Sequence, residues 1–456
     1  MVKPLITVYI TNYNYERYIE QAIQSVLNQS FQDFELLIID DGSTDDSKTI
    51  IESYSDHPKI QVIYQKNKGL NITNNIALKL SKGKYIMRLD ADDYLDTEAL
   101  KKMVDYLEAD PELGMVFPDY YIVDSGNNIV SEIKRHDFKK EVTIYDQPAH
   151  GACTMIRVKA MKAVGGYDES YTCQDGYELW IKFISKFKVA SINETLFSYR
   201  RHNNNLTNNE LRILDTRLKI KDAFVQRERI PLPKTAAVIP IRPNYDIALE
   251  NFNGSTFLDR KIASLQRAKN ISKIIVASSD PLIEEHIKKQ YGDGIDFFRR
   301  SEKIERINIS LLETLAAIHK SGMIDSCSAA MFCSVNYPFV DAGIINDAVN
   351  TLSIFNADSL IGVRPEGNTF FRHTGQGMQA ILKQDSFTRL ERESLYKYTG
   401  GVLLTKIETA LSTKKLIHGN VGHIVISEKA ALNVESAFEK QFCLYLVKEN
   451  EIEVVD

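Results

Sequence analysis

The feature that most constrains the fold is a regular alternation of strand and helix patterns over the first 90 residues. Apolar strand patterns lie at residues 6–11, 34–40, 60–64 and 85–89, with helical patterns between them at 19–27, from about 45, and at 72–80. This alternation predicts a mainly parallel sheet with helices on both faces. Ligands bind such sheets beyond the carboxyl ends of the strands. The polar clusters at 12–14, 40–46 and 90–93 stand at those ends.

The same pattern restarts in the second half of the chain. An amphipathic helix is predicted at about 210–229, and the segment 230–235, with its two prolines, is typical of a linker. Strand and helix patterns then alternate again at 236–241, 257–268, 273–279 and 281–289. At 456 residues the chain is too long for one ordinary core. We therefore expect an α/β protein with two Rossmann-like domains in tandem, at 1–229 and 236–456.

Charge and composition exclude several classes of protein. The net charge of -5 and the lack of a basic block argue against a nucleic-acid partner. No apolar run reaches the roughly 18 residues of a spanning helix, and no signal peptide is expected before the first strand. Five widely spaced cysteines without a CxxC pair predict reduced thiols in a cytoplasmic protein. Peripheral membrane association and self-association are left open.

Three carboxylates follow the strand pattern Tyr85 to Leu89, at Asp90, Asp92 and Asp93. They can form a solvated turn that caps the next helix, or they can hold a divalent cation through hard oxygen ligands. For this motif alone the solvated turn is the better interpretation, because short motifs often match by chance. A second strand pattern ends in Asp40 and Asp41. Two acidic strand ends in one predicted sheet favour a shared binding site.

Several ordered stretches resemble the family 2 glycosyltransferases, which have the A-type nucleotide-diphospho-sugar fold. They are ITVYITNYN, IIDDGSTDDS and NKGLNITNNIALKLSKGKYIMRLDADD, and the resemblance spans about residues 5–205. It implies that Thr11, Tyr13 and Asp41 frame the base of a nucleotide-sugar donor. It also implies that Asp90 lies near the ribose and that Asp92 ligates a magnesium or manganese ion.

The same resemblance assigns further residues. It implies that Asp93 faces the donor sugar or the acceptor, and that Asp175, in YTCQDGYELW, is the catalytic base. Without the resemblance, Asp175 would be interpreted as a helix N-cap. In SYRRH, Arg200 and His202 match a Tyr-Arg-x-His element expected near the diphosphate. Asn74-Asn75 departs from the Arg-Asn of many members, which leaves donor recognition open.

The second half resembles the cytidylyltransferases that activate sialic-acid-like sugars, over about residues 235–445. Three of that family's chemical elements are altered. Arg242 is followed by a segment without the expected lysine, residues 334–340 lack the family's Gln and Arg, and an Asp-x-Asp metal pair is replaced by Asn433 and Glu435. Loss of a metal carboxylate removes charge that Mg²⁺ coordination would use. We expect a domain that has kept its fold and lost nucleotidyl transfer.

The resemblance and the residues together predict an inverting, metal-dependent glycosyltransferase of polysaccharide biosynthesis. Its partners would be a nucleotide-sugar donor and a hydroxyl group on a glycan, a lipid-linked glycan or a protein. One alternative is a bifunctional enzyme whose C-terminal domain also makes a CMP-activated nonulosonic acid. Another is a C-terminal domain that only binds or oligomerises.

Overall fold

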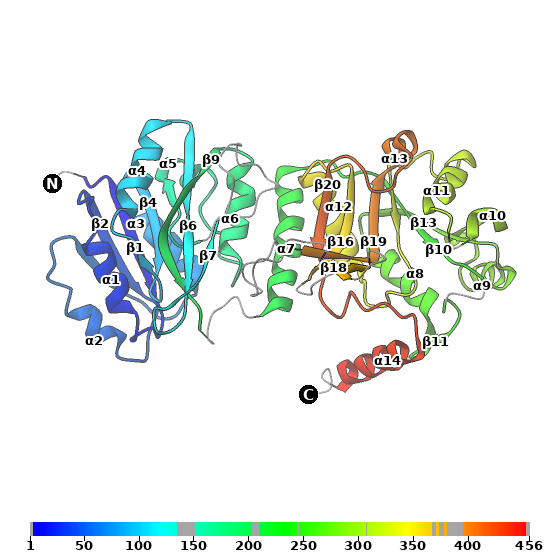
Figure 1. The fold of residues 1–456 in the computed structure, drawn as a ribbon, viewed down its shortest axis with the longest axis horizontal. Helices are drawn as coiled ribbons and strands as arrows, with labels where there is room; N and C mark the ends of the chain where they lie inside the picture. The colour runs from blue at the N-terminus through cyan, green and yellow to red at the C-terminus, as the bar shows by residue number, and fades with distance from the viewer. Residues whose placement is uncertain are drawn as a thin grey trace. The chain divides into compact units, whose positions relative to one another are not determined.

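The structure is a computed structural model that describes residues 3–134, 151–202, 209–243, 247–306, 308–366, 371–373, 378–380 and 395–452. The chain divides into two compact units, Met1–Arg217 and Leu218–Asp456 (Figure 1). The division falls inside helix α7 (Glu210–Glu228). The domain limits of 1–229 and 236–456 stay a prediction.

The N-terminal unit is built on a mixed, mainly parallel sheet with the strand order β3-β2-β1-β4-β8-β6-β9-β5, to which β7 adds by pairing with β6. The strands are β1 (Ile6–Asn12), β2 (Phe34–Asp40), β3 (Ile60–Tyr64), β4 (Tyr85–Asp90), β5 (Tyr94–Leu95), β6 (Leu113–Val123), β7 (Ile129–Ile133), β8 (Met155–Arg157) and β9 (Lys188–Arg200). Strands β1 to β4 are mutually parallel, as the sequence predicted. The antiparallel strand β8 extends the sheet beyond β4.

Helices cover both faces of this sheet. They are α1 (Ile19–Leu27), α2 (Ser47–Glu52), α3 (Leu70–Leu80), α4 (Ala99–Ala109), α5 (Val158–Ala163) and α6 (Asp175–Ile184). Alternation along β1 explains the two layers, because Val8 and Ile10 enter one core cluster with residues of α1 and α4. Tyr9, between them, belongs to a second cluster with residues of α3, α5 and α6. The predicted arrangement of helices on both faces is confirmed.

The strand order places a binding edge between β1 and β4. From β1 the chain moves outward to β2 and β3 and then returns to β4 on the other side of β1. Such a reversal opens a crevice at the carboxyl ends of the two strands. Thr11 and Asp90 are direct neighbours in the register of these strands. The acidic end of β4 therefore lies where a ligand of this fold would bind.

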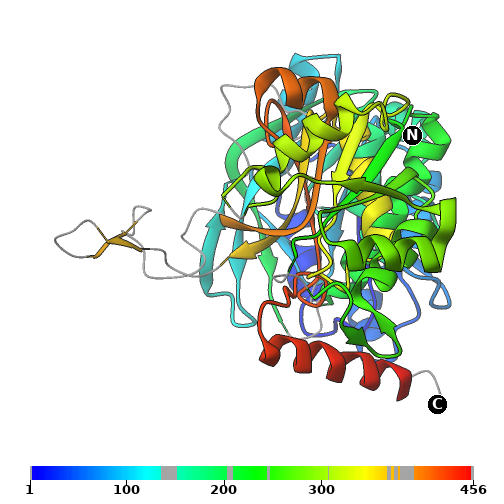
Figure 2. The same cartoon turned by 90° about the vertical axis from the view of Figure 1, so that its right-hand side faces the viewer.

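The C-terminal unit has a second sheet, with the order β14-β13-β10-β15-β19-β16-β20. Its strands are β10 (Thr235–Pro240), β13 (Ile271–Ser278), β14 (Asp296–Arg299), β15 (Ala329–Phe332), β16 (Ser359–Glu366), β19 (Leu395–Lys406) and β20 (Val421–Val425), with short pairs β11 (Asn251–Phe252) and β12 (Ser255–Thr256), and β17 (Phe371–His373) and β18 (Met378–Ala380). In the seven-stranded sheet β19 is antiparallel to β15 and β16 and the other neighbours are parallel, whereas the two short pairs are antiparallel. Figure 2 shows β17 and β18 at a distance from this sheet.

The helical elements of this unit after α7 are α8 (Phe257–Arg267), α9 (Pro281–Tyr291), the 3₁₀ turn η2 (Gly292–Gly294), α10 (Glu302–Glu305), α11 (Leu311–Lys320), α12 (Ala342–Ile354), α13 (Ile407–Thr413) and α14 (Ala437–Ile452). Two core clusters fill the two faces of the sheet. The chain is thus an α/β protein with two mainly parallel sheets in tandem. No helix among the described residues is both long and apolar enough to cross a membrane.

Candidate active site

The site begins at the carboxyl ends of β1 and β4. Thr11 Oγ1 donates a hydrogen bond of 3.1 Å to Asp90 Oδ1 across the two strands. Tyr13, two residues beyond Thr11, is 46% exposed, so its ring is open to a ligand. Three residues that the family resemblance assigned to the nucleotide therefore lie along one edge of the sheet.

Arg88, which the sequence analysis did not single out, joins the two halves of the predicted site. Its Nε lies 2.9 Å from Asp90 Oδ1, and its Nη1 contacts Asp175 Oδ2. Asp175 opens helix α6, and the N-cap of that helix is Gln174, in a left-handed conformation with φ of 61°. The Asp175 side chain thus pairs with Arg88 instead of capping the helix. The predicted base and the predicted ribose ligand share one guanidinium.

Burial and neighbouring charges shift the pKa values of Asp90 and Arg88. Burial raises the pKa of Asp90, and the carboxylates of Asp92 and Asp175 raise it further, while Arg88 opposes them. Burial alone would lower the pKa of Arg88, but Asp175 and Asp90 outweigh it and raise that pKa. Shifts of this kind are common where a protein gathers groups for catalysis.

Asp92 lies beside His202, the last residue of the Tyr-Arg-x-His element. His202 Nε2 is 3.0 Å from Asp92 Oδ2. The imidazole stacks on Tyr18 at 5.8 Å between ring centroids and meets the edge of Tyr15 at 5.7 Å. In the described part of the chain, no three His, Cys, Asp or Glu side chains gather as a metal site. Asp92 and His202 are therefore a pair of candidate ligands that a substrate would have to complete.

Asp93 and Arg200 are buried residues that stabilise the site through hydrogen bonds. Asp93 is 1% exposed, and its Oδ1 accepts a hydrogen bond of 2.9 Å from the backbone N–H of Arg200. Arg200 is equally buried, and its Nε donates to the carbonyl oxygen of Asp92 at 2.8 Å. Its Nη2 donates to Gln21 Oε1 at 2.9 Å. These contacts favour a positioning role for both residues, and their predicted contacts with sugar and diphosphate stay predictions.

Asp40 and Asp41 at the end of β2 hold loops. Asp41 is 6% exposed and accepts from the backbone N–H groups of Lys68 and Gly69, each at 2.8 Å. Asp40, which had no assigned role, accepts from Asn12 Nδ2 at 2.7 Å. The loops after β1, β2 and β3 are thus joined. The predicted contact of Asp41 with a nucleotide base is not tested by this geometry.

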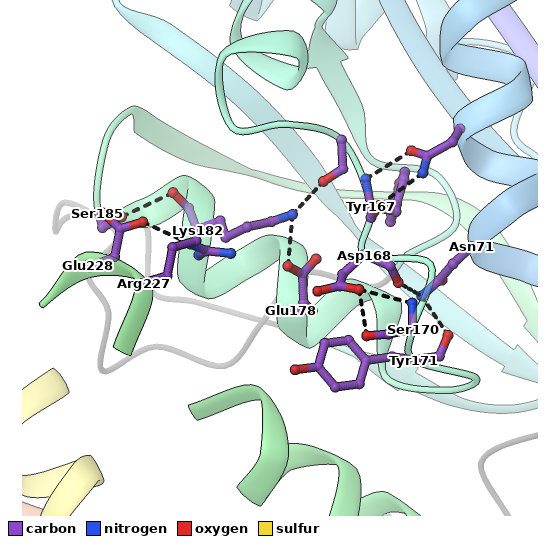
Figure 3. Close-up of polar contacts among 12 residues, drawn as sticks. Asn71, Tyr167, Asp168, Ser170, Tyr171, Glu178, Lys182, Ser185, Arg227 and Glu228 are labelled. Atoms are coloured by element: carbon purple, nitrogen blue, oxygen red, sulfur yellow. Dashed lines mark hydrogen bonds and ion pairs between the residues drawn. The ribbon is translucent and has the colours of Figure 1, made fainter. Parts of the chain in front are cut away.

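Helix α3 holds the segment that leads to Asp175 (Figure 3). Asn71 Nδ2 donates to the carbonyl oxygens of Asp168 and Tyr171 at 2.7 and 2.9 Å. Asn75 binds Tyr167 twice, donating to its carbonyl oxygen at 2.9 Å and accepting from its N–H at 3.0 Å. Asn75, the second residue of the Asn74-Asn75 pair, therefore has a structural role: it binds the backbone of Tyr167 to α3.

The residues around Asp175 are fixed from two further sides. In α6, Lys182 Nζ pairs with Glu178 Oε1 at 2.8 Å and also donates to the carbonyl oxygen of Gly166 (Figure 3). Within the same unit, Arg217 of α7 donates from Nε to Gln174 Oε1 at 2.6 Å. Gln174, the residue before the predicted base, is thus held by an arginine.

In the C-terminal unit, the altered motifs contact one another. Asn336 Nδ2 donates to the carbonyl oxygen of Val434 at 2.9 Å, and Asn433 Nδ2 donates to Glu435 Oε1 at 2.6 Å. Arg300 is also buried, since only 2% of its side chain is exposed, and its Nη1 lies 4.0 Å from Glu305 Oε1. Polar groups at this edge are engaged in the fold.

Comparison with known proteins assigns both halves. The profile of glycosyl transferase family 2 matches residues 7–165, and that of cytidylyltransferase matches residues 248–396. An uncharacterized glycosyltransferase of Methanocaldococcus jannaschii is 32% identical over 210 residues, which are 44% of this chain and 72% of that protein. The chain belongs to glycosyl transferase family 2.

Further proteins are similar to about half of the chain. The chondroitin synthase of Escherichia coli is 31% identical over 211 residues, which span 46% of this chain and 31% of that synthase. A solved structure of S. aureus TarS in complex with UDP-GlcNAc overlaps 48% of this chain and 65% of its own, with 19% identity and a TM-score of 0.41. The chain thus joins a segment that matches glycosyltransferases to one that matches cytidylyltransferases, and it spans less than a third of the length of the chondroitin synthase.

Proposed function

We propose that the N-terminal unit transfers a sugar, with inversion, from a nucleotide-sugar donor to a hydroxyl group, with Mg²⁺ or Mn²⁺ bound. One observation carries most of the proposal: Asp90 and Asp175 both contact Arg88, and Asp92, two residues after Asp90, contacts His202. One end of this cluster suits a nucleotide and a cation. The other end supplies a carboxylate base.

The proposed roles come from the family resemblance, and the positions of the residues are compatible with them. Thr11, Tyr13 and Asp41 line the edge that receives the nucleotide, and Asp90 meets the ribose. Asp175 accepts the proton of the acceptor hydroxyl while that oxygen attacks the anomeric carbon. A positioned general base contributes roughly 10²–10⁴ in rate.

A cation fits the pair of Asp92 and His202. Mg²⁺ and Mn²⁺ take hard oxygen ligands, and Mg²⁺ is commonly held by one or two carboxylates together with phosphate oxygens and water. A neutral imidazole can add one nitrogen ligand. When bound, the cation would neutralise charge on the departing nucleoside diphosphate. A pair of protein ligands, completed by the donor, is therefore sufficient.

The acceptor is proposed from the relatives. Chondroitin synthase, hyaluronan synthase and a putative teichuronic acid glycosyltransferase are named for glycan products. We infer a growing glycan, free or carried on a lipid or a protein, as the acceptor. For the C-terminal unit we propose a retained fold without nucleotidyl transfer, because residues 334–340 lack the Gln and Arg of that family and Asn433 and Glu435 replace its metal pair. Asn336 and Asn433 are hydrogen-bonded within the fold.

A donor screen tests the proposal. UDP-, GDP-, dTDP- and CMP-sugars are each added with Mn²⁺ or with EDTA, and thermal stabilisation and donor turnover are measured. We expect one donor class to stabilise the protein only when Mn²⁺ is present, and the Asp92→Asn variant to lose that dependence. Equal stabilisation with EDTA would refute the role of the cation.

The base is tested separately. Asp175→Asn should lower kcat by roughly 10²–10⁴ while donor binding, read by thermal shift, is kept. Asp105→Asn is the matched control, because Asp105 is exposed on α4 and pairs with Lys101 at the surface. Near-normal turnover of Asp175→Asn would refute the assignment.

A further inference from the structure

Arg88 occupies an unusual position for a charged residue. It lies inside strand β4 between Met87 and Leu89, and it is 5% exposed. Alternation along the strand places Arg88 and Asp90 on the same face. A buried guanidinium needs buried acceptors for its N–H groups, and carboxylates also balance its charge. Here the two carboxylates that pair with it are the proposed ribose ligand and the proposed base.

The guanidinium of Arg88 contacts the two carboxylates through different nitrogen atoms. Nε and Nη2 face Asp90 at 2.9 and 3.2 Å, to Oδ1 and Oδ2 respectively. Nη1 contacts only Oδ2 of Asp175. Oδ1 of Asp175 has no hydrogen bond to any residue that the structure describes, and 13% of this side chain is exposed. One oxygen of the base is thus held, and the other is left for a substrate.

The surroundings keep the guanidinium in one orientation. A Cβ atom added to Gly151 would lie 2.4 Å from Nη2 and 3.0 Å from Cζ of Arg88, so the backbone at Gly151 packs directly on the group. The backbone N–H of Cys153 donates to the carbonyl oxygen of Arg88 at 2.8 Å. Tyr9 and Tyr167 are buried close by, and burial raises the pKa of both phenols while the positive charge of Arg88 opposes that rise. Little room remains for another rotamer.

We propose that Arg88 is a positioning residue of the transfer reaction: it holds Oδ2 of Asp175 so that Oδ1 receives the acceptor proton, and it fixes that carboxylate relative to Asp90. This rests on the proposed function. In the step, the acceptor O–H bond breaks and its proton moves to Asp175 Oδ1 as the acceptor oxygen bonds to the anomeric carbon. The bond from that carbon to the diphosphate oxygen breaks, and the nucleoside diphosphate leaves with the electron pair.

An arginine is suited to this work because its planar fork spans two carboxylates at fixed angles. A lysine at the same place would supply the charge at a single point and could not hold both partners. Small misplacements of a reacting group are costly, since about 1 Å can lower a rate by roughly 10². Arg88→Lys should therefore keep the positive charge in the core but lose the fixed orientation of the Asp175 carboxylate relative to Asp90.

The test measures kcat and donor affinity of Arg88→Lys, alone and combined with Asp175→Asn. We expect kcat to fall by roughly 10² in the single variant. We expect no further fall when the change is added to Asp175→Asn, because both act through one group. Gly151→Ala, which pushes on the guanidinium without changing a charge, should lower kcat in the same non-additive way.

The matched control is Arg157→Lys. Arg157 is a second arginine of this sheet, at the end of β8, and it binds the carbonyl oxygens of Leu113 and Leu107 at 3.1 and 2.9 Å. It should lower thermal stability and leave kcat within a few-fold. Wild-type kcat in Arg88→Lys, or losses that multiply with Asp175→Asn, would overturn the proposal. Absence of any transfer by the wild-type chain would instead refute the proposed function, so the two failures are distinguishable.

Discussion

Replacing Lys221 by methionine should destabilise the C-terminal unit strongly, because it removes the cation from a buried ion pair. Lys221 of α7 places Nζ 2.7 Å from Asp347 Oδ1, 2.8 Å from Asp347 Oδ2 and 2.9 Å from Thr351 Oγ1. The two charged side chains are 8% and 11% exposed. Removing one partner leaves a buried carboxylate without its counter-charge.

The magnitude follows from that burial. Breaking a buried pair by deleting one partner costs about 3–5 kcal/mol, whereas an exposed pair is worth about 0–1 kcal/mol. With a urea m-value of about 2–3 kcal/mol per molar, the midpoint of unfolding should fall by roughly 1–2 M. Replacing both charges, as in Lys221→Met with Asp347→Leu, should recover most of the loss.

Urea titration followed by two probes measures this effect. Far-UV circular dichroism follows the whole chain, and fluorescence of Trp180, the single tryptophan, follows the N-terminal unit. We expect the midpoint followed by circular dichroism to shift, and the midpoint followed by Trp180 fluorescence to stay unchanged. Lys269→Met is the control, because Lys269 pairs with Asp222 of the same helix at 2.7 Å and is 51% exposed. A midpoint for Lys221→Met equal to that of the control would refute the reasoning.

Two further predictions concern the core of each unit. Burial lowers the pKa of Lys261 from 10.5 to about 8. The unfolded chain therefore holds this proton to higher pH than the folded chain, so wild-type stability relative to Lys261→Met should rise by about 2–3 kcal/mol between pH 7 and pH 10; a flat difference in unfolding free energy would contradict this. In Gly83→Ala, the new Cβ would lie 2.5 Å from the backbone nitrogen of Thr7. Overpacking there should lower the free energy of unfolding by about 1–3 kcal/mol, measured from the unfolding transition of Trp180. An unchanged midpoint would contradict this, because it would mean that the backbone shifts without cost.

The local elements of the fold were predictable because their signals are local. Strands β1 to β4 and helices α1 to α3 begin and end within a few residues of their predicted limits. Each has an apolar period that matches the face it buries. The clustering of polar strand ends between β1 and β4 was also predictable, since parallel strands end on one edge.

The contacts that join the site were not predictable in the same way. Arg88 and Asp175 are 87 residues apart, and no local pattern connects them. A usable signal was present, because an arginine inside an otherwise apolar strand must find a buried partner. The family resemblance placed Arg200 near the diphosphate, while its environment is a network of backbone acceptors that spacing alone cannot reveal.

The position of the unit division within α7 has a practical consequence. The predicted linker at 230–235 joins α7 to β10, and the C-terminal unit contains both β10 and the part of α7 from Leu218 onward. A protease that cuts there would sever the chain without freeing either piece, because Lys221 would still dock on Asp347. The nicked fragments should migrate together and separate only under denaturing conditions. In a chimaera of two related enzymes, both folds would therefore be preserved only if the crossover point lay before Lys221.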